Sequence, residues 1–332
     1  MKGDHRVGPR ILPIAIPVPH AADRVLAYLI ADEPLTLIDT GPNTDAAYAA
    51  VRDGLARAGV GIDALERIVV THAHIAHCGL AGRLHADSGA RVAGHPLALG
   101  ALEDFGAAWS ERLDLIERAA AVGNVPDAVR TAHRAMASPM ARLVADVPRD
   151  AMDPLVDGAS LRLAASGTLS VVHIPGHSAD HIGLHHPSSG TSITGDLVLR
   201  GSPTVPSLEP RTPDGARPAT FDDLVASWRR IGRLPMRAVL PGHGTPIRAH
   251  RILLARRLAE ARSALGATRD AVRSGAATLW DVAEATGLPM EPERLASTLG
   301  QVVARLDALV RRGVLARRAD DGQLRFVAIA RR

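Results

Sequence analysis

Three histidines fall within the six residues His72-Ala73-His74-Ile75-Ala76-His77. The β-branched run Ile68-Val69-Val70 in front of them predicts a buried strand, and residues 79–82 behind them predict the start of a helix. The histidines are therefore expected on a strand-to-helix turn, where α/β folds place their chemistry. Imidazoles this close together cannot all be protonated, so the pattern favours a divalent metal ion over a histidine-rich surface turn.

Three further polar residues each follow a predicted strand and a glycine. They are His177 after Gly176, Asp196 after Gly195, and His243 after Gly242. All three are expected to project from the same edge of layered sheets as the histidine cluster. Imidazole and carboxylate ligands without a thiolate suit zinc or another first-row ion.

The elements that position these residues alternate between strands and helices. Apolar runs predict strands at residues 11–18, 25–31 and 35–38, and Thr44 has the side chain of a helix N-cap. A helix to residue 58, the strand before the histidines, a helix to about residue 86 and a strand at 91–94 follow. This order of elements predicts an α/β layered fold.

From residue 96 onward, helical segments are expected before and after a second group of strands. Residues 96–147 lack strand signals and predict a helical insertion of two or three helices. Strands are then expected at 159–163, 170–174, 182–186, 192–195 and 238–240, with a proline-rich loop at 200–219 and a helix at 221–231 between the last two. After Ile247 come helices at 250–274, 278–286 and 293–312 and two strand-like runs around Asp320-Asp321-Gly322. This last order is typical of a winged helix.

The composition sets broad limits on location and partners. The 332 residues carry a net charge of +4, and no apolar run reaches the roughly 18 residues of a membrane span. The first residues lack the apolar stretch of a signal peptide, and a single cysteine fits a reducing compartment, so a cytoplasmic protein without a membrane partner is expected. Residues 251–332 hold 15 Arg against 9 acidic residues. Because this segment has almost no aromatic residues for stacking, the excess favours a solvated face over an RNA-binding one.

In combination these motifs resemble the metallo-β-lactamase fold, whose pattern is His-x-His-x-Asp-His, a later His, a bridging Asp and a final His. The resemblance covers about residues 10–247 and implies an αββα sandwich that binds one or two zinc ions, with iron or manganese as alternatives. Carried over position by position, it assigns roles to eight residues: His72, His74 and His177 to a first metal, His77 and His243 to a second, Asp196 as the bridge, Asp39 as a support for the ligands, and Ala76 at a ligand position. His181, four residues past His177, is expected either to contact substrate or to orient a neighbour, with simple packing as the alternative.

Ala76 departs from the family pattern, which has an aspartate at this position. That carboxylate binds the second metal and the bridging hydroxide in the family. The second site, left with His77, His243 and Asp196, is therefore expected to be weaker and hydrolysis slower. Two explanations fit Ala76: natural divergence within the family, or a substitution that silences the enzyme.

The segment Pro175-Gly176-His177-Ser178-Ala179-Asp180-His181 and the winged-helix-like tail resemble the β-lactamase-like protein 2 branch, which includes endoribonucleases and thioesterase-like members. We expect a catalytic domain at residues 1–248 and a C-terminal domain at 249–332, which could support a homodimer. The first hypothesis is a hydrolase of a thioester, ester or lactone such as an acyl-CoA, with the insertion as a lid. The alternatives are an endoribonuclease and a catalytically silent metal-binding protein.

Overall fold

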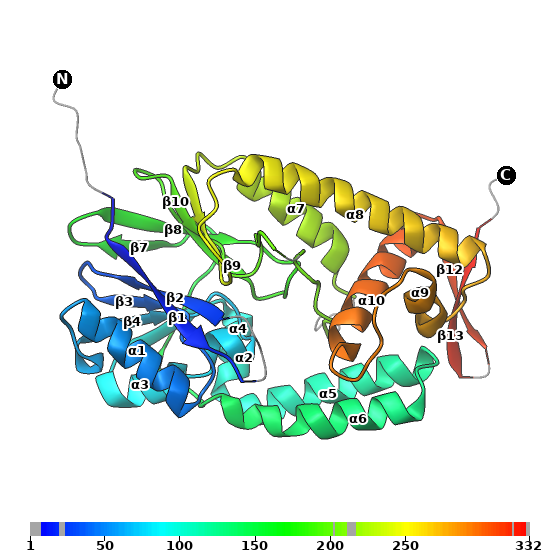
Figure 1. Ribbon diagram of the computed structural model, residues 1–332, viewed down its shortest axis with the longest axis horizontal. Coiled ribbons are helices and arrows are strands. Elements are labelled where there is room, and N and C mark those ends of the chain that lie inside the picture. The colour runs from blue at the N-terminus through cyan, green and yellow to red at the C-terminus, as the bar shows by residue number, and fades with distance from the viewer. Residues whose placement is uncertain (1–7, 20–23, 202, 211–216, 321, 330–332) are drawn as a thin grey trace.

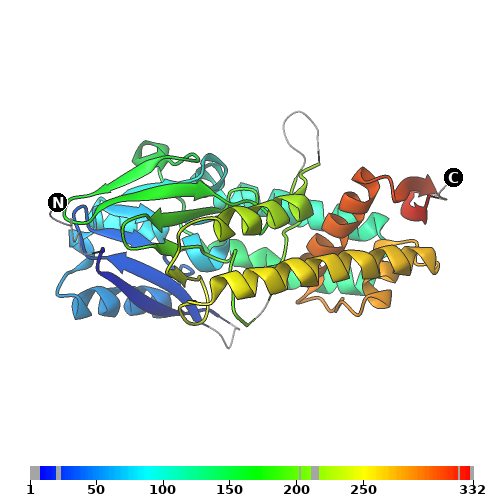
Figure 2. The same ribbon diagram turned by 90° about the horizontal axis from the view of Figure 1, so that it is seen from above.

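The computed structural model describes residues 8–19, 24–201, 203–210, 217–320 and 322–329. Figure 1 shows two stacked sheets with helices outside them, and a mainly helical part that extends from one end. Figure 2, seen from above, shows the long helix α8 (His250–Arg273) running from the sheets into that helical part. Within the described ranges, no helix combines the length and the apolar character needed to cross a membrane.

The first sheet is mixed, with the strand order β1-β2-β3-β4-β5-β6. Its first two strands form an antiparallel hairpin in which Ile11 lies opposite Ile30. The pairs from β3 to β6 are parallel, so the carboxyl ends of these strands share one edge. The six strands are β1 Ile11–Pro17, β2 Arg24–Ile30, β3 Thr36–Ile38, β4 Arg67–Val69, β5 Arg91–Gly94 and β6 Met152–Pro154.

The second sheet is also mixed, with the order β11-β10-β9-β8-β7. Its neighbouring strands are antiparallel except for β10 and β11, which run parallel. The five strands are β7 Ser160–Leu163, β8 Gly167–His173, β9 Ile182–His186, β10 Thr191–Ile193 and β11 Ala238–Leu240.

Apolar side chains from both sheets form a common core between them. Ile30 and Val69 of the first sheet are buried in one cluster with Val171 and Leu184 of the second. A second cluster joins the outer face of the first sheet to α1 (Asp45–Arg57) and α3 (Ala81–Ser88). A third joins the second sheet to α7 (Thr220–Gly232) and α8. The layers are therefore helix, sheet, sheet, helix, an arrangement in which each sheet buries both faces.

The helix after the histidine strand begins earlier than expected. Helix α2 spans Ile75–Cys78 with His74 as its N-cap, and α3 follows after two residues. His77 therefore lies inside a helix, whereas His72 lies in a bend before it and His74 is extended. This change of backbone conformation within six residues lets the three imidazoles approach from different directions.

The insertion at 96–147 contains three α-helices, namely α4 (Pro96–Glu103), α5 (Phe105–Val122) and α6 (Asp127–Ala137), followed by a 3₁₀ helix at Ser138–Leu143. Strand β6 was not expected. It has only three residues, ends in Pro154 and pairs with β5 alone, so it carries no alternating pattern that the sequence could reveal.

The C-terminal segment continues from α8 with α9 (Leu279–Ala285), α10 (Leu295–Arg311) and the hairpin of β12 (Leu315–Asp320) with β13 (Gln323–Ala328). Its core is shared with the insertion. Ile116 of α5 is buried in one cluster with Leu299 of α10 and Phe326 of β13. Three helices and a hairpin thus occur in the expected order, and the insertion packs against them.

Candidate metal centre

The structure brings His72, His74 and His177 together from both sheets. One ring nitrogen of each lies within 4.8 Å of the others. His74 and His72 follow β4 of the first sheet, and His177 follows β8 of the second. His177 Nε2 lies 2.9 Å from His74 Nδ1. The second nitrogen of each ring contacts a protein oxygen, so one nitrogen of each is left facing the shared centre.

Those outer contacts fix how each ring is turned. His72 Nδ1 lies 2.9 Å from Thr71 Oγ1, and His74 Nε2 lies 3.1 Å from Ser207 Oγ. His177 Nδ1 donates to the carbonyl oxygen of Val205 at 2.8 Å. Metal-binding histidines characteristically use their outer nitrogen in this way, because the contact fixes the tautomer and the ring orientation.

Asp196 lies at the middle of a second group. Ligand atoms of His72, His77 and Asp196 also lie within 4.8 Å of one another. Asp196 Oδ2 is 3.4 Å from His77 Nε2, 3.7 Å from His177 Nε2 and 3.6 Å from His243 Nε2. A single carboxylate oxygen therefore faces histidines of both predicted metal positions, as a bridging ligand would.

His243 follows β11 and lies beside this group through Asp196, but it is not one of the three residues whose ligand atoms all lie within 4.8 Å of one another. Its Nδ1 lies 3.1 Å from the carbonyl oxygen of Arg24 in β2, and it forms an isolated bridge with Val25. Gly242 is needed for this approach. A Cβ at residue 242 would lie 2.3 Å from Asp196 Oδ1 and 2.7 Å from His77 Cε1, so any side chain would displace the predicted ligands.

Asp39 connects two of the histidines from behind. Its Oδ1 accepts the Thr71 backbone N–H at 2.7 Å, and its Oδ2 lies 2.9 Å from both Thr71 Oγ1 and His77 Nδ1. Thr71 Oγ1 also contacts His72 Nδ1, so Asp39 is linked to His72 through Thr71. Asp39 is buried and adopts a left-handed conformation with φ of 57°, which aspartate tolerates better than most residues.

His181 supports the predicted bridge. It is fully buried, its ring stacks on that of His72 at 4.6 Å, and its Nε2 accepts the backbone N–H of Asp196 at 3.1 Å. Of the three expectations for this residue, namely substrate contact, orientation of a neighbour and simple packing, this contact fits the orientation of a neighbour. Gly195 allows it, since a Cβ there would lie 2.8 Å from both His181 Nε2 and Thr71 Oγ1.

Two positioning residues were missed in the sequence. Asp180 is buried, and its Oδ2 accepts the backbone N–H of Ala73, between two predicted ligands, at 2.7 Å. Ser207 contacts His74. An acidic residue beside His181 was a usable signal for Asp180, whereas a serine in a proline-rich loop carries no signal at all.

The carboxylate and the imidazoles of the centre shift one another's pKa. Burial would raise the pKa of Asp196, but His77, His177 and His243 together hold it well below its usual range. Burial would likewise lower the pKa of His77, but Asp196 and Asp39 raise it to about 10, so an ion that binds His77 must displace a proton from its ring. Burial lowers the pKa of His72, His74 and His177, so these rings favour the neutral form that binds metals.

The donor atoms fit a cation. His72 Nε2, His77 Nε2 and Asp196 Oδ1 are buried and have no hydrogen-bond partner among the described residues. Such atoms are costly to bury unless a ligand or ion satisfies them. Imidazole nitrogens and a carboxylate oxygen suit a divalent first-row ion.

Ala76 lies in α2 immediately before His77 and adds no donor atom. Within the described part of the chain, Asp196 supplies the one carboxylate in the two groups that could hold a metal. The position at which the family carries a second carboxylate is therefore without an anionic ligand, as the sequence indicated.

Comparisons with known proteins show relatives along most of the chain. A Bacillus subtilis (strain 168) protein named "Probable metallo-hydrolase YqjP" is 29% identical over 303 residues, which cover 90% of this chain and 92% of that protein.

Solved structures show the same fold. A metallo-beta-lactamase family protein from Thermus thermophilus has a TM-score of 0.80 at 22% identity, covering 96% of this chain and 98% of its own. A beta-lactamase domain protein from Burkholderia ambifaria has a TM-score of 0.77 at 23% identity, covering 96% and 92%. The family profile described as "Metallo-beta-lactamase superfamily" matches residues 21–243, and the chain belongs to that superfamily.

Proposed function

We propose that this metal-dependent hydrolase acts on a small molecule with a thioester, ester or lactone group, such as an acyl-CoA. The observation that carries the hydrolase assignment is the convergence of His72 Nε2, His77 Nε2 and Asp196 Oδ1 at one edge of two sheets, all buried and without a hydrogen-bond partner among the described residues. Hydrolysis of an acyl group needs a nucleophilic water and a positive centre for the developing oxyanion.

We propose that His72, His74 and His177 hold a first ion, His77 and His243 a second, and that Asp196 bridges them. A divalent ion bound there would supply a hydroxide near neutral pH, because it lowers the pKa of a coordinated water to about 7. Asp196 stays ionised because three histidines hold its pKa down, so it is available as an anionic ligand. Asp39 keeps the inner nitrogens of His72 and His77 aimed at the centre through contacts of 2.9 Å. We propose zinc as the ion, with iron or manganese as alternatives.

The surroundings of His74 support an anionic acyl substrate. Arg112 of α5 contributes to the lowering of the pKa of His74, after burial and His177. It also acts on the buried Glu209, whose pKa burial raises and Arg112 lowers. A guanidinium from the insertion, beside a metal ligand, would favour a substrate with a carboxylate or phosphate group. This placement supports the insertion as part of the substrate site.

The absence of a carboxylate at Ala76 leads to a direct test. Ala76→Asp is expected to raise both the metal content of the purified protein and its turnover, because it adds an anionic donor beside His77. Ala76→Asn is the matched control, since it has the same shape without the charge. Metal content would be measured by atomic emission, and turnover on a panel of thioester, ester and lactone substrates. No gain in either quantity with Ala76→Asp would contradict the idea of a weakened second site.

An endoribonuclease is the second candidate, favoured by the excess of arginine after residue 250. Several of these arginines already pair with acids, such as Arg257 with Glu260 and Arg317 with Asp307, which leaves less charge for phosphates. RNA binding whose affinity falls steeply with salt would favour this candidate. We also keep the winged-helix arrangement of the C-terminal segment, the β-lactamase-like protein 2 branch and a homodimer as proposals.

A third candidate is a silent metal-binding protein, made plausible by Ala76. The substrate panel, extended with RNA and applied to the metal-loaded chain, separates the three candidates. Turnover of an acyl substrate supports our proposal, cleavage of RNA supports the nuclease, and bound metal without any turnover supports the silent protein.

A further inference from the structure

Helix α10 of the C-terminal segment lies directly against the loop 204–208. Gly300, buried in α10, is the point of contact. A Cβ at residue 300 would lie 2.2 Å from the carbonyl oxygen of Pro206 and 3.1 Å from the backbone nitrogen of Leu208. The two backbones therefore touch, and even one added carbon would force them apart.

The same loop contacts three of the predicted metal ligands. His177 is held twice, by the Val205 carbonyl oxygen at 2.8 Å from its Nδ1 and by the Ser207 N–H, which donates to its carbonyl oxygen at 2.8 Å. Ser207 Oγ lies 3.1 Å from His74 Nε2. Thr204 Oγ1 donates to the backbone oxygen of Asp196 at 2.8 Å. Any movement of the loop would thus be transmitted to His74, His177 and Asp196.

The loop is also anchored on its far side. The Leu208 side chain is buried in the cluster that α5 forms with the C-terminal helices. The loop therefore lies between the predicted metal centre and the core of the C-terminal segment, with contacts on both sides.

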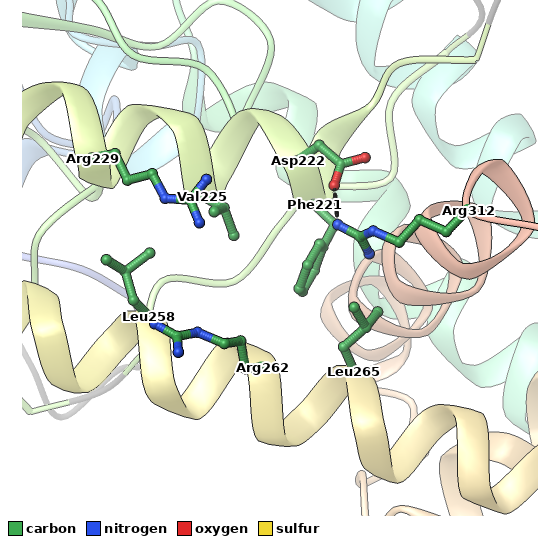
Figure 3. A pocket seen from close by; sticks show the side chains of 8 residues that line it. All are labelled: Phe221, Asp222, Val225, Arg229, Leu258, Arg262, Leu265 and Arg312. Atoms are coloured by element: carbon green, nitrogen blue, oxygen red, sulfur yellow. Dashed lines mark hydrogen bonds and ion pairs between the residues drawn. The ribbon is translucent and has the colours of Figure 1, made fainter. Parts of the chain in front are cut away.

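Helix α10 is itself fixed on α7. Asp222 of α7 pairs with Arg311 at 2.7 Å and with Arg312 at 2.6 Å. Figure 3 shows the Asp222–Arg312 pair at one end of a cavity of about 180 Å³ between α7, α8 and the end of α10. Beside this pair, Phe221 of α7 packs against Ala304 and Ala308 of α10.

Helix α7 also packs against the loop that contains His177. Gly176 has a φ of 128°, and a Cβ there would lie 2.3 Å from the Leu224 Cα. Ser227 Oγ donates to the carbonyl oxygen of Pro175 at 2.7 Å. Two helices that touch each other thus hold the His177 turn from one side and the loop 204–208 from the other.

We propose that α10 is a positioning element of the metal centre, in which Gly300 sets the place of the loop 204–208 and Ser207 passes that placement to His74. The C-terminal segment is then a part of the metal site and not an appended module. This inference rests on the proposed metal centre but not on the proposed substrate.

The test compares two glycine substitutions in helices. Gly300→Ala inserts a methyl group between α10 and the loop. Gly266→Ala in α8 is the matched control, since a Cβ there meets nothing within 4 Å and both changes gain the same helix propensity. Zinc affinity would be measured by competition with a chromophoric chelator, and thermal unfolding of the metal-free protein would be followed in parallel.

Gly300→Ala is expected to weaken zinc binding roughly 10- to 100-fold, as changes to the contacts behind metal ligands do, while Gly266→Ala leaves it unchanged. Equal zinc affinity for both variants would overturn the proposal, even if Gly300→Ala lowers the thermal stability, because packing would then be its whole role.

Ser207 gives a second, independent variant that keeps the backbone contact. Ser207→Ala is expected to weaken zinc binding about 10-fold by freeing His74 Nε2, and Ser207→Thr, which keeps a hydroxyl, to restore most of it. If Gly300→Ala does not fold, the two Ser207 variants test the proposal instead. An unchanged zinc affinity in Ser207→Ala overturns it. Because zinc affinity is the readout, a failure to find turnover would count against the proposed hydrolase alone. A starting chain that binds no metal would refute the metal centre itself.

Discussion

Asp39 shows how one buried carboxylate can organise several ligands. It fixes His77 directly and His72 through Thr71, and it accepts the backbone N–H that ends the histidine strand. Its left-handed backbone is the conformation that brings both oxygens to these partners. The strain of that conformation is acceptable because three hydrogen bonds determine it together.

Asp39→Asn is expected to weaken zinc binding roughly 10- to 100-fold, because the amide cannot accept from both Thr71 and His77 at the second oxygen. Asp45→Asn is the control, since the Asp45 side chain is 96% exposed in α1 and pairs with Arg83 instead of a predicted ligand. The comparison would use chelator competition at constant pH. Equal losses in the two variants would show that Asp39 has no specific role.

At the scale of single residues, the sequence identified candidate ligands wherever a metal-binding residue type occurs at a suitable spacing. The histidines at 72, 74 and 77, and the ligand types after Gly176, Gly195 and Gly242, could all be identified, and the structure brings them to one centre. Ser207 and Val205 could not, because their roles depend on which groups face them in the fold, whereas Asp180 had a usable signal in its place beside His181. A carbonyl oxygen such as that of Val205 leaves no trace in the sequence at all.

Among the elements, α1 illustrates a boundary that local chemistry determines. Thr44 precedes the helix in an extended conformation, and its hydroxyl accepts the Ala47 N–H at 3.1 Å. The sequence predicted this cap because threonine there is followed by a helix-forming run. By contrast, helix α2 begins before the predicted helix start at residues 79–82. Its N-cap, His74, makes no side-chain hydrogen bond to the helix, so no capping residue in the sequence marks this boundary.

Thr44→Ala is expected to lower the free energy of unfolding by about 1 kcal/mol, because one backbone N–H of α1 loses its partner. Thr44→Ser, which keeps the hydroxyl, should lose much less. Urea denaturation of both variants measures the difference. Zinc affinity should not change in either, since α1 lies on the outer face of the first sheet, and a change would contradict the separation of stability from metal binding.

The strands, too, could be predicted only where their own residues give a local signal. Residues 91–94, 182–186 and 238–240 were predicted at their observed bounds because each is a short segment with apolar residues between turn residues. Strand β6 was missed because three residues that end in proline resemble a loop. Its pairing with β5 is decided by the fold around it and not by its own side chains.

On the scale of the whole molecule, the predicted ligands come from both sheets. His72, His74 and His77 follow a strand of the first, whereas His177, Asp196 and His243 follow strands of the second. Binding an ion therefore joins the two sheets at one edge in addition to the apolar core between them. The sequence predicted this convergence but not the contact of α10 with the ligand loop, which depends on tertiary packing.

Metal removal should therefore destabilise the whole fold. An ion that binds only the folded chain stabilises it by about 2.7 kcal/mol at a hundred times its Kd, which corresponds to a rise in Tm of roughly 5 °C. Thermal unfolding with excess zinc and with excess chelator measures the shift. His177→Ala should abolish most of it, and a full shift in that variant would place the stabilising ion elsewhere.

The core that α5 shares with the C-terminal helices has a consequence for how such a chain can diverge. Ile116 and Val125 are buried in one cluster with apolar residues of the C-terminal helices. A relative that has lost its tail should therefore carry polar side chains at these two positions, or have lost the insertion as well. Insertion and tail are expected to be gained, kept or discarded together.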